Sequence, residues 1–322
     1  MPFISRFILL LGALLVSACA QQAPAFTPPS ERPVAASEKP WPKNHVLGIA
    51  YHDVEDLDPD QAVVAVRTER MIEQLAWLRE NNYKPVTVDQ IMAARKGGPE
   101  LPPKAILLSF DDGYSSFYTR VLPVLRAYNW HALLAPVGTW IDTPLNQPVD
   151  FAGTPRARSD FLTWEQVREI SRSGLVEIAA HTDANHKGIL ANPQGNLQPA
   201  AATRRYDPLT KRYESEADFR ARIRTDVSNI SEKIRKATGY KPRVWVWPYG
   251  TADGTSLTVV GEEGYEMALT LDDGLDALDN LMSSPRFLVA SDPDGTHFAN
   301  SVVSVQSDFA MRVVHVDLDN VY

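Results

Sequence analysis

The sequence predicts an α/β protein whose single domain is a distorted (β/α)7 barrel. Short apolar runs recur along the chain, and each is followed by a stretch with the apolar spacing of a helix. Such alternation is typical of a parallel sheet. The chain has 322 residues, a length that suits one large α/β domain or two small ones. About seven strands in one domain favour a closed or nearly closed barrel over an open sheet.

The strands are predicted from short apolar runs, which are the pattern of strands buried on both faces. The predicted strands are residues 46–51, 105–110, 132–136, 176–180, 244–247, 267–270 and 313–316. The last run contains His315, which we interpret as a core or edge residue of that strand.

The helices between the strands are predicted from apolar residues at helical spacing. An early helix is marked by Met71, Leu75 and Leu78. Thr163, with Gln166 three residues later, fits a capping box at the start of another helix. The longest pattern steps by four, four, three and four through Phe219, Ile223, Val227, Ile230 and Ile234. Gly239 follows it, as glycine often does at a helix end.

Residues 1–18 are predicted to be a secretory signal peptide. Arg6 precedes an apolar run, residues 7–16, that is too short for a comfortable membrane span and is followed by small residues. Residues 16–19, Val-Ser-Ala-Cys, resemble the bacterial lipobox, in which the cysteine is acylated. Cys19 is the only cysteine of the chain, so it has no partner for an internal disulfide. We therefore expect a lipid on Cys19.

Residues 19–43 are predicted to be the lipid anchor and a proline-rich linker, and residues 44–322 the folded domain. The linker composition cannot bury a core and is typical of a partly extended tether. Gln21 occupies the second mature position, where an aspartate would indicate retention in the inner membrane. By resemblance to bacterial lipoproteins, we expect an anchor on the periplasmic side of the outer membrane.

The composition excludes one class of partner. The chain is 44% apolar and 22% charged, which is ordinary for a globular protein. Its formal net charge is -8 and its pI is near 5.4. Because phosphate backbones select basic surfaces, we expect no nucleic-acid partner.

Polar residues gather where the predicted strands end. These residues are His52 and Asp53, Asp111 and Asp112, His181, and Pro248 and Tyr249. In (β/α) barrels the C-terminal ends of the strands carry the chemistry. The sequence therefore predicts one site at this end of the barrel.

Asp111 and Asp112 are the first candidates for that site. Neighbouring side chains in a strand point to opposite faces, so we expect both carboxylates just past the strand, where Gly113 lets the chain turn. There one carboxylate can bind a metal while the other accepts a proton. An Asp-Asp-Gly run alone more often marks a turn, so the assignment depends on its neighbours.

His181 and His186 provide that second observation. A spacing of five puts two side chains on different helix faces, so a metal-binding pair requires a loop that curls back, and Asp183 and Asn185 suit such a loop. With one carboxylate, the two imidazoles predict a site for one divalent metal ion with positions left for water and substrate. These ligands suit zinc, iron, nickel or cobalt better than magnesium.

The motifs together resemble those of the polysaccharide deacetylases of carbohydrate esterase family 4. The resemblance covers most of residues 46–318 and rests on Ser-Phe-Asp-Asp-Gly at 109–113, His-Thr with a later His at 181–186, and Trp-Pro-Tyr-Gly at 247–250. It implies a hydrolase that removes acetyl groups from an N-acetylated glycan polymer. It also implies a metal held by Asp112, His181 and His186, a general base at Asp111 and an oxyanion donor at the Tyr249 amide.

Within this family, the wide histidine spacing, the His52-Asp53 pair and the lipobox are most similar to the deacetylases of poly-N-acetylglucosamine biofilm polymers. That similarity implies the polysaccharide export machinery as a partner. Peptidoglycan, chitin-like oligomers and O-acetylated glycans stay open as substrates, and a non-catalytic polymer-binding lipoprotein is an alternative of another class. Gram-negative relatives carry a second, glycoside-hydrolase-like domain, so the chain is a single-domain relative or a truncated form.

The site departs from the family pattern in three ways. One extra residue separates the histidines, and Val246 stands where many members have an arginine that orients the base. The late Leu-x-His motif that supplies the general acid is not clearly present. We therefore assign the acid to His52, at the end of the first strand, and expect Asp53 to orient it.

Three other features surround the predicted site. Four aromatic residues are candidates for stacking on sugar rings, namely Trp140, Trp245, Trp247 and Tyr114. For Trp245 a core position fits equally well. Asp272 and Asp273 are either neighbours of the site or part of a turn. Residues 187–215 form a long insertion that either lines the substrate groove or is mobile.

Overall fold

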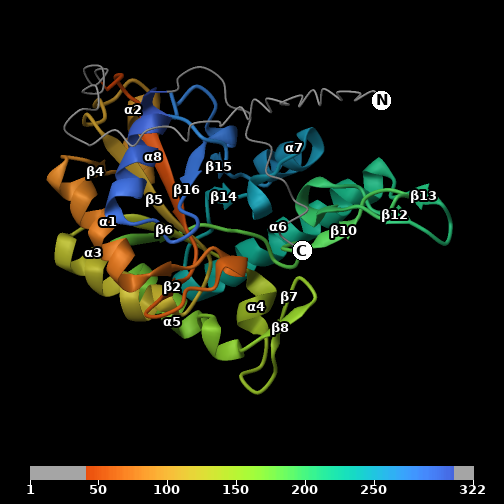
Figure 1. The fold of residues 1–322 in the computed structure, drawn as a ribbon. Coiled ribbons are helices and arrows are strands. Elements are labelled where there is room, and N and C mark those ends of the chain that lie inside the picture. The colour runs from red at the N-terminus through yellow and green to blue at the C-terminus, as the bar shows by residue number, and fades with distance from the viewer. Residues whose placement is uncertain (1–40, 308–322) are drawn as a thin grey trace, which may run out of the picture. The chain divides into compact units, whose positions relative to one another are not determined.

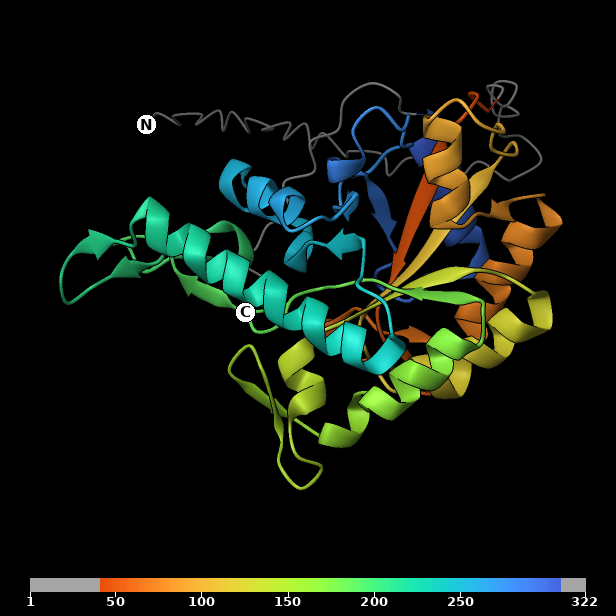
Figure 2. The same cartoon turned by 180° about the vertical axis from the view of Figure 1, so that it is seen from behind.

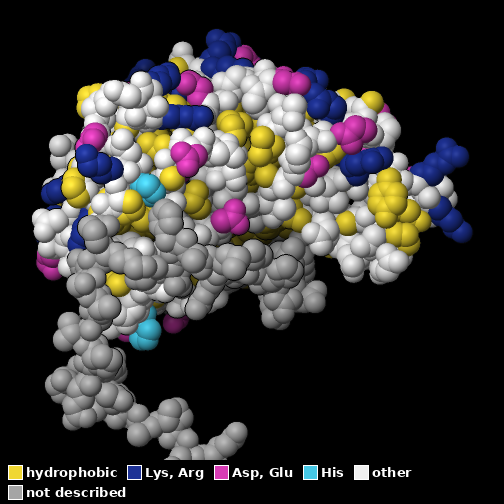
Figure 3. Space-filling view, turned by 90° about the horizontal axis from the view of Figure 1, so that it is seen from above, with side chains coloured by type: hydrophobic (Ala, Val, Ile, Leu, Met, Phe, Trp, Pro, Cys, Tyr) yellow, Lys and Arg dark blue, Asp and Glu magenta, His cyan; other side chains and the backbone are white. Residues whose placement is uncertain are grey.

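The computed structural model describes residues 41–307 of the chain (Figure 1). The predicted signal peptide, Cys19, and the predicted strand at 313–316 with His315 lie outside the described residues. None of the described helices combines the length and the apolar character needed to cross a membrane. On the face seen in Figure 3, basic side chains lie among acidic and apolar ones, so its described part has no continuous basic surface.

Seven parallel strands form the centre of the fold. Five lie side by side in the order β16, β1, β5, β6 and β9, and β14 pairs with β15. Parallel bridges from Ala180 to Trp245 and from Leu269 to Ser284 join the two groups at both edges. The strands therefore close the distorted (β/α)7 barrel that the sequence predicts. Their bounds are β1 Val46–Tyr51, β5 Ala105–Asp112, β6 Ala132–Pro136, β9 Val176–Ile178, β14 Val244–Val246, β15 Met267–Leu269 and β16 Arg286–Leu288.

The strand β16 is the one barrel strand that the sequence analysis missed. Six barrel strands lie where they were predicted, although β9 ends two residues earlier. β16 lies in the short apolar run 285–290, which Arg286 interrupts. A charged residue argues against a buried strand unless a buried partner compensates it, and that partner lies far away in the sequence.

The helices cover the outside of the barrel (Figures 1 and 2). Helix α5 packs on α6, α6 on α7, and α1 on α8. The predicted capping box of Thr163 and Gln166 is present at the start of α5, and Gly239 ends α6 with a φ of 93°. The bounds are α1 Thr68–Glu80, α2 Val88–Arg95, α3 Leu122–Tyr128, α4 Gly138–Asp142, α5 Trp164–Arg172, α6 Glu216–Thr238, α7 Gly254–Glu262 and α8 Gly295–Ser307.

Alternate residues of each barrel strand belong to two different hydrophobic clusters. Leu107, Leu133 and Val244 are buried in the cluster inside the barrel. Their neighbours, such as Ile106 and Trp245, are buried in the larger cluster between the barrel and the helices. Because side chains alternate along a strand, each strand thus fills both layers, which explains its continuous apolar sequence.

The insertion at 187–215 forms two small antiparallel pairs of strands beside the N-terminal half of α6 (Figure 2). Arg222 on α6 donates hydrogen bonds to the carbonyls of Ala200 and Thr203, at 2.8 Å each, and forms an ion pair with Glu214. The insertion therefore has ordered local structure. The small strands of the fold are β2 Val54–Glu55, β3 Val66–Arg67, β4 Lys84–Pro85, β7 Val149–Phe151, β8 Thr154–Arg156, β10 Gly188–Leu190, β11 Leu197–Pro199, β12 Tyr206–Asp207 and β13 Arg212–Tyr213.

Candidate active site

The two neighbouring acids are the last residues of β5. Asp111 follows Leu107 and Ser109 on the face of β5 that points into the barrel. Asp112 has a φ of 70°, a left-handed backbone conformation that breaks the alternation of the strand. The expectation that both acids lie beyond the strand was therefore wrong. The positive φ of Asp112 lets both carboxylates serve one site from within β5.

Asp111 is paired with an arginine from the opposite end of the sequence. The guanidinium of Arg286 donates to both carboxylate oxygens of Asp111, at 2.8 and 2.9 Å, and both side chains are buried. Arg286 also donates to Ser109 Oγ at 2.9 Å and to the Thr270 carbonyl at 3.0 Å. Many family members have a motif arginine at the position that Val246 occupies here. In this chain, Arg286 on β16 holds Asp111 instead.

The glycine at position 48 makes room for this arginine. Gly48 pairs with Arg286 in the register of β1 and β16. A Cβ at position 48 would lie 2.5 Å from the Pro285 carbonyl oxygen and 2.7 Å from the Cγ of Arg286. The close approach of the two strands therefore requires a residue without a side chain.

The charge of Arg286 keeps Asp111 ionised. Burial alone raises the pKa of a carboxyl. The Arg286 guanidinium outweighs this effect, with help from His181 and His52, and the pKa of Asp111 is lowered. A carboxylate that is held charged and fixed at both oxygens is suited to accept a proton in one orientation.

Asp112, His181 and His186 converge on one point. The Nε2 atoms of the two histidines each lie 3.3 Å from Oδ1 of Asp112, and all three side chains are buried. Apart from one another, Asp112 Oδ1 and His181 Nε2 have no hydrogen-bond partner among the described residues. Ligands about 2.1 Å from a metal lie roughly 3.0–3.4 Å from one another, so this spacing fits a metal ion. The three residues can therefore hold one divalent ion.

The protonation of Asp112 and His186 agrees with this role, whereas Asp111 and Asp112 raise the pKa of His181 although burial opposes them. Burial lowers the pKa of His186 to about 4. The two histidines lower the pKa of Asp112 although burial opposes them. His181 Nδ1 lies 2.9 Å from the Val246 carbonyl, which holds the ring and directs Nε2 toward Asp112. A neutral imidazole and a charged carboxylate are the forms that bind metals.

His52 lies at the same end of the barrel, but Asp53 does not orient it. His52 is close enough to Asp111 and Asp112 to lower both of their pKa values. Asp53 instead accepts hydrogen bonds from Ser116 Oγ at 2.6 Å and from the Val54 amide at 2.8 Å. The Nδ1 atom of His52 is buried and has no hydrogen-bond partner within the described part of the chain.

Tyr249 lies against the second histidine. It follows β14 with a φ of 56°, and its ring centroid lies 4.6 Å from that of His186. The next residue, Gly250, would place a Cβ only 2.6 Å from the Cβ of Leu271. The turn is therefore packed too closely for any side chain at position 250.

The four aromatic residues proposed to stack on sugars are buried. Tyr114, Trp140, Trp245 and Trp247 expose at most 4% of their surface. Trp140 packs against His186 with ring centroids 4.8 Å apart, so it helps to hold that ring in place. The stacking prediction was wrong for Tyr114, Trp245 and Trp247, which fill the core, whereas Trp140 also lines a cleft beside His186.

Asp272 lies in the surroundings of the Asp111–Arg286 pair. It accepts a hydrogen bond of 2.8 Å from the Thr270 hydroxyl, and the Thr270 carbonyl accepts one from Arg286. Asp273 is exposed, and partial desolvation together with the charge of Asp272 raises its pKa. Asp272 was predicted to be either a neighbour of the site or part of a turn. Its hydrogen bond from Thr270 favours the first interpretation.

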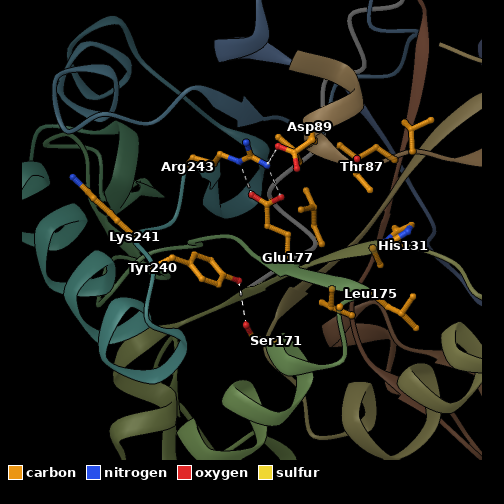
Figure 4. A pocket seen from close by; sticks show the side chains of 16 residues that line it. Thr87, Asp89, His131, Ser171, Leu175, Glu177, Tyr240, Lys241 and Arg243 are labelled. Carbon is orange, nitrogen blue, oxygen red and sulfur yellow. Dashed lines mark hydrogen bonds and ion pairs between the residues drawn. The ribbon is translucent and has the colours of Figure 1, made fainter. Parts of the chain in front are cut away.

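A cleft of about 430 Å³ opens beside His186. Its polar lining comes from α4, the β7–β8 hairpin and the residue after His186, namely Thr139, Thr143, Asp150 and Lys187. A larger cavity of about 590 Å³ lies at the opposite end, where β6, β9 and β14 begin (Figure 4). The larger of the two cavities is therefore not the one beside the metal ligands. The unpartnered ligand atoms favour the smaller cleft as the substrate site.

Arg286 is the site residue that sequence reasoning missed. The available signal was a single charge inside an apolar run of six residues, 285–290. Such a charge needs a buried partner of opposite sign, and Asp111 was already a candidate.

Comparisons with known proteins agree with this site. A family model described as polysaccharide deacetylase matches residues 98–268. The chain is 45% identical over 316 residues to the poly-beta-1,6-N-acetyl-D-glucosamine N-deacetylase of Escherichia coli (strain K12). That match spans 98% of this chain and 47% of the relative. The chain thus spans about half the length of the curated relatives it matches.

Two solved structures have a similar fold. The de-N-acetylase from Aggregatibacter actinomycetemcomitans is 35% identical with a TM-score of 0.72, covering 80% of this chain and 99% of that chain. The BpsB deacetylase domain from Bordetella bronchiseptica is 39% identical with a TM-score of 0.70, covering 76% and 96%. The family match includes both acids and both histidines and covers more than half of this sequence. The chain therefore belongs to the polysaccharide deacetylase family.

Proposed function

We propose that this protein is a metal-dependent N-deacetylase of poly-N-acetylglucosamine. The observation that carries the proposal is the convergence of Asp112, His181 and His186 at 3.3 Å beside the ionised Asp111. The substrate is supported by the 45% identical relative, whose name is poly-beta-1,6-N-acetyl-D-glucosamine N-deacetylase.

The metal ligands in this proposal are Asp112, His181 and His186. Two imidazoles and one carboxylate suit zinc, iron, nickel or cobalt better than magnesium. The chemistry that such an ion supplies when bound is Lewis acidity, which polarises an amide carbonyl and makes water a better nucleophile at neutral pH.

Asp111 is the general base of the proposed reaction. Its lowered pKa leaves it ionised at neutral pH, and Arg286 fixes both of its oxygens. It accepts a proton from the water that attacks the acetyl carbon. The negative charge that develops on the acetyl oxygen receives a hydrogen bond from the Tyr249 amide, the kind of donor whose loss costs about 3–4 kcal/mol in other hydrolases.

His52 is the general acid. When the bond between the acetyl carbon and the nitrogen breaks, the departing sugar amine needs a proton, and a protonated His52 donates it. The products are acetate and a glucosamine unit. The position of His52 beside both acids supports this role.

Measurement of free acetate tests the proposal. The purified full chain is incubated with zinc and β-1,6-linked N-acetylglucosamine oligomers, and in parallel with β-1,4-linked oligomers, peptidoglycan and an O-acetylated glycan. We expect acetate from the β-1,6-linked oligomers, loss of it with a chelator and recovery on adding metal. Acetate from another substrate alone would replace the substrate in the proposal, and no acetate from any would favour a non-catalytic polymer-binding protein.

The proposal includes a location on the periplasmic side of the outer membrane, through a lipid on Cys19. It is supported by the lipobox-like residues 16–19 and the proline-rich stretch after them. Replacement of Cys19 by serine is expected to move the protein from the membrane fraction to the soluble periplasmic fraction. Recovery of this variant with the outer membrane would contradict the anchor. The polysaccharide export machinery is the proposed partner at that membrane, testable by co-purification.

A further inference from the structure

One buried carboxylate lies at the centre of the loop that carries both histidines. Asp226 projects from α6 and is only 6% exposed. It accepts hydrogen bonds from the Thr182 hydroxyl at 2.5 Å, the Asp183 amide at 3.1 Å and the Ala184 amide at 2.7 Å. Three consecutive residues between His181 and His186 are thus bound to a single side chain.

These bonds explain how a spacing of five residues can form a metal site. Residues 181–186 leave the barrel, turn and return toward Asp112, so their amides cannot pair within a strand or helix. Asp226 accepts from the first half of the turn. Thr182 Oγ1 also accepts a hydrogen bond of 3.0 Å from the Asn185 amide, which extends the network to the residue before His186.

The same loop is also held by other groups. The Asp183 carbonyl accepts from the amide and the hydroxyl of Thr139, at 2.9 and 2.8 Å, and the Asp183 carboxylate pairs with Lys233. Gly138 lies so close that a Cβ there would be 2.2 Å from Asp183 Oδ1. The loop is therefore held by Thr139 of α4 and by two charged residues of α6, Asp226 and Lys233.

We propose that Asp226 is a positioning residue for the metal site, acting as the template around which residues 181–186 close. The inference rests on the metal site of the proposed function. Asp226 occupies the buried stripe of α6 between Ile223 and Val227, where an apolar residue would avoid the cost of burying a charge. The three hydrogen bonds to the loop offset part of that cost and couple α6 to the geometry of His181 and His186.

Zinc affinity of the full chain tests this proposal, measured by competition with a chromophoric chelator and without any substrate. For Asp226→Ala we expect about 10–100-fold weaker zinc binding, the effect that loss of such outer partners has in other metal sites. Asp226→Asn should lie between this variant and the wild type, because the amide keeps one acceptor oxygen but points its NH₂ group at a donor.

Ser231→Ala is the matched control. Ser231 is buried on the same helix and bonds to the Val227 carbonyl at 2.7 Å and to the Tyr265 hydroxyl at 2.8 Å, away from the histidine loop. We expect this variant to lower the melting temperature of the metal-free protein while zinc affinity stays at the wild-type value. The absorption spectrum of the Co²⁺ form should change for the Asp226 variants and stay unchanged for Ser231→Ala.

Thr182→Val provides a test from the loop side that leaves α6 intact. It removes the hydroxyl that Asp226 binds, and we expect weaker zinc binding in the same direction as for Asp226→Asn. Wild-type zinc affinity and an unchanged Co²⁺ spectrum in folded Asp226→Asn and Thr182→Val would overturn the proposal. If the wild type binds zinc but releases no acetate, only the proposed substrate fails, since the affinity test does not depend on turnover.

Discussion

The two ends of the barrel differ in how their charged side chains are exposed and paired. At the N-terminal end, Arg243 reaches Glu177 at 2.9 and 3.0 Å and Asp89 at 2.8 Å, so these three charges in the lining of the larger cavity are paired with one another (Figure 4). At the C-terminal end, Asp112 Oδ1 and His181 Nε2 are buried without an outside partner among the described residues. The convergence of three metal-binding side chains therefore indicates the functional end better than cavity size or one unpartnered atom does, since Asp276 Oδ2 near the start of β1 is also buried without a partner among the described residues.

The physical reason is the cost of burying a polar atom without a hydrogen bond. That cost is about 1–3 kcal/mol for each group, and folded proteins rarely accept it without a ligand or a functional need. A paired and half-exposed charge carries no such cost. The following four changes test this contrast between the two ends.

The largest effect is expected for His181→Ala. Removing one of three ligands should abolish metal binding and reduce acetate release to background. Metal content and free acetate measure this directly, and added zinc should raise the melting temperature of the wild type but not that of His181→Ala. His131→Ala, at the N-terminal cavity, is the control and should keep both properties. A metal-loaded, active His181→Ala protein would defeat the ligand assignment.

Asp111→Asn should separate chemistry from metal binding. The amide is close to the carboxylate in shape but cannot accept the proton, so we expect acetate release to fall about 10²–10⁴-fold while metal content stays near the wild-type level. Glu177→Gln at the other end should leave the rate unchanged. Acetate release at the wild-type rate in Asp111→Asn would show that another group is the base.

Arg286→Met should reveal the cost of an unpaired charge at the C-terminal end. Its partner Asp111 would remain buried at 2% exposure without a counter-charge. We expect the free energy of unfolding to fall by about 3–5 kcal/mol, with a loss of activity. Urea denaturation of the metal-free protein measures the first effect. A change below about 1 kcal/mol would mean that Asp111 finds another partner or protonates at little cost.

The smallest effect is expected for Arg243→Met. The side chains of Arg243 and Glu177 are 29% and 25% exposed, and that of Asp89 is 81% exposed. Water screens such pairs, so the free energy of unfolding should change by about 0–1 kcal/mol and the rate of acetate release should not change. A loss as large as that of Arg286→Met would remove the contrast between the two ends.

Local patterns in the sequence were sufficient for most of the fold. Six barrel strands, the capping box at Thr163 and the buried stripe of α6 follow from apolar periodicity and helix capping, which act over a few residues. The candidate ligands could also be read from the sequence, because they follow strands whose C-terminal ends must meet in a barrel.

The orientation of these groups could not be read in the same way. Asp53 was expected to orient His52, but it binds Ser116, which is 63 residues away. The aromatic residues near the motifs were expected in the groove, but packing buries them. Sequence spacing does not specify which of several nearby partners a side chain selects, since that choice depends on the relative placement of whole elements.

The sequence by itself determined a closed α/β barrel, its motif residues and the family to which they point. Only the tertiary structure decided that Arg286 holds Asp111, its partner 175 residues earlier, and that Asp226 organises the histidine loop from 44 residues away. Both contacts bring a buried charged side chain to its partners across the core, a guanidinium for Asp111 and a hydroxyl and two amides for Asp226. They form because a buried charge must find its partner in space, and closure of the barrel, rather than local propensity, brings those partners together.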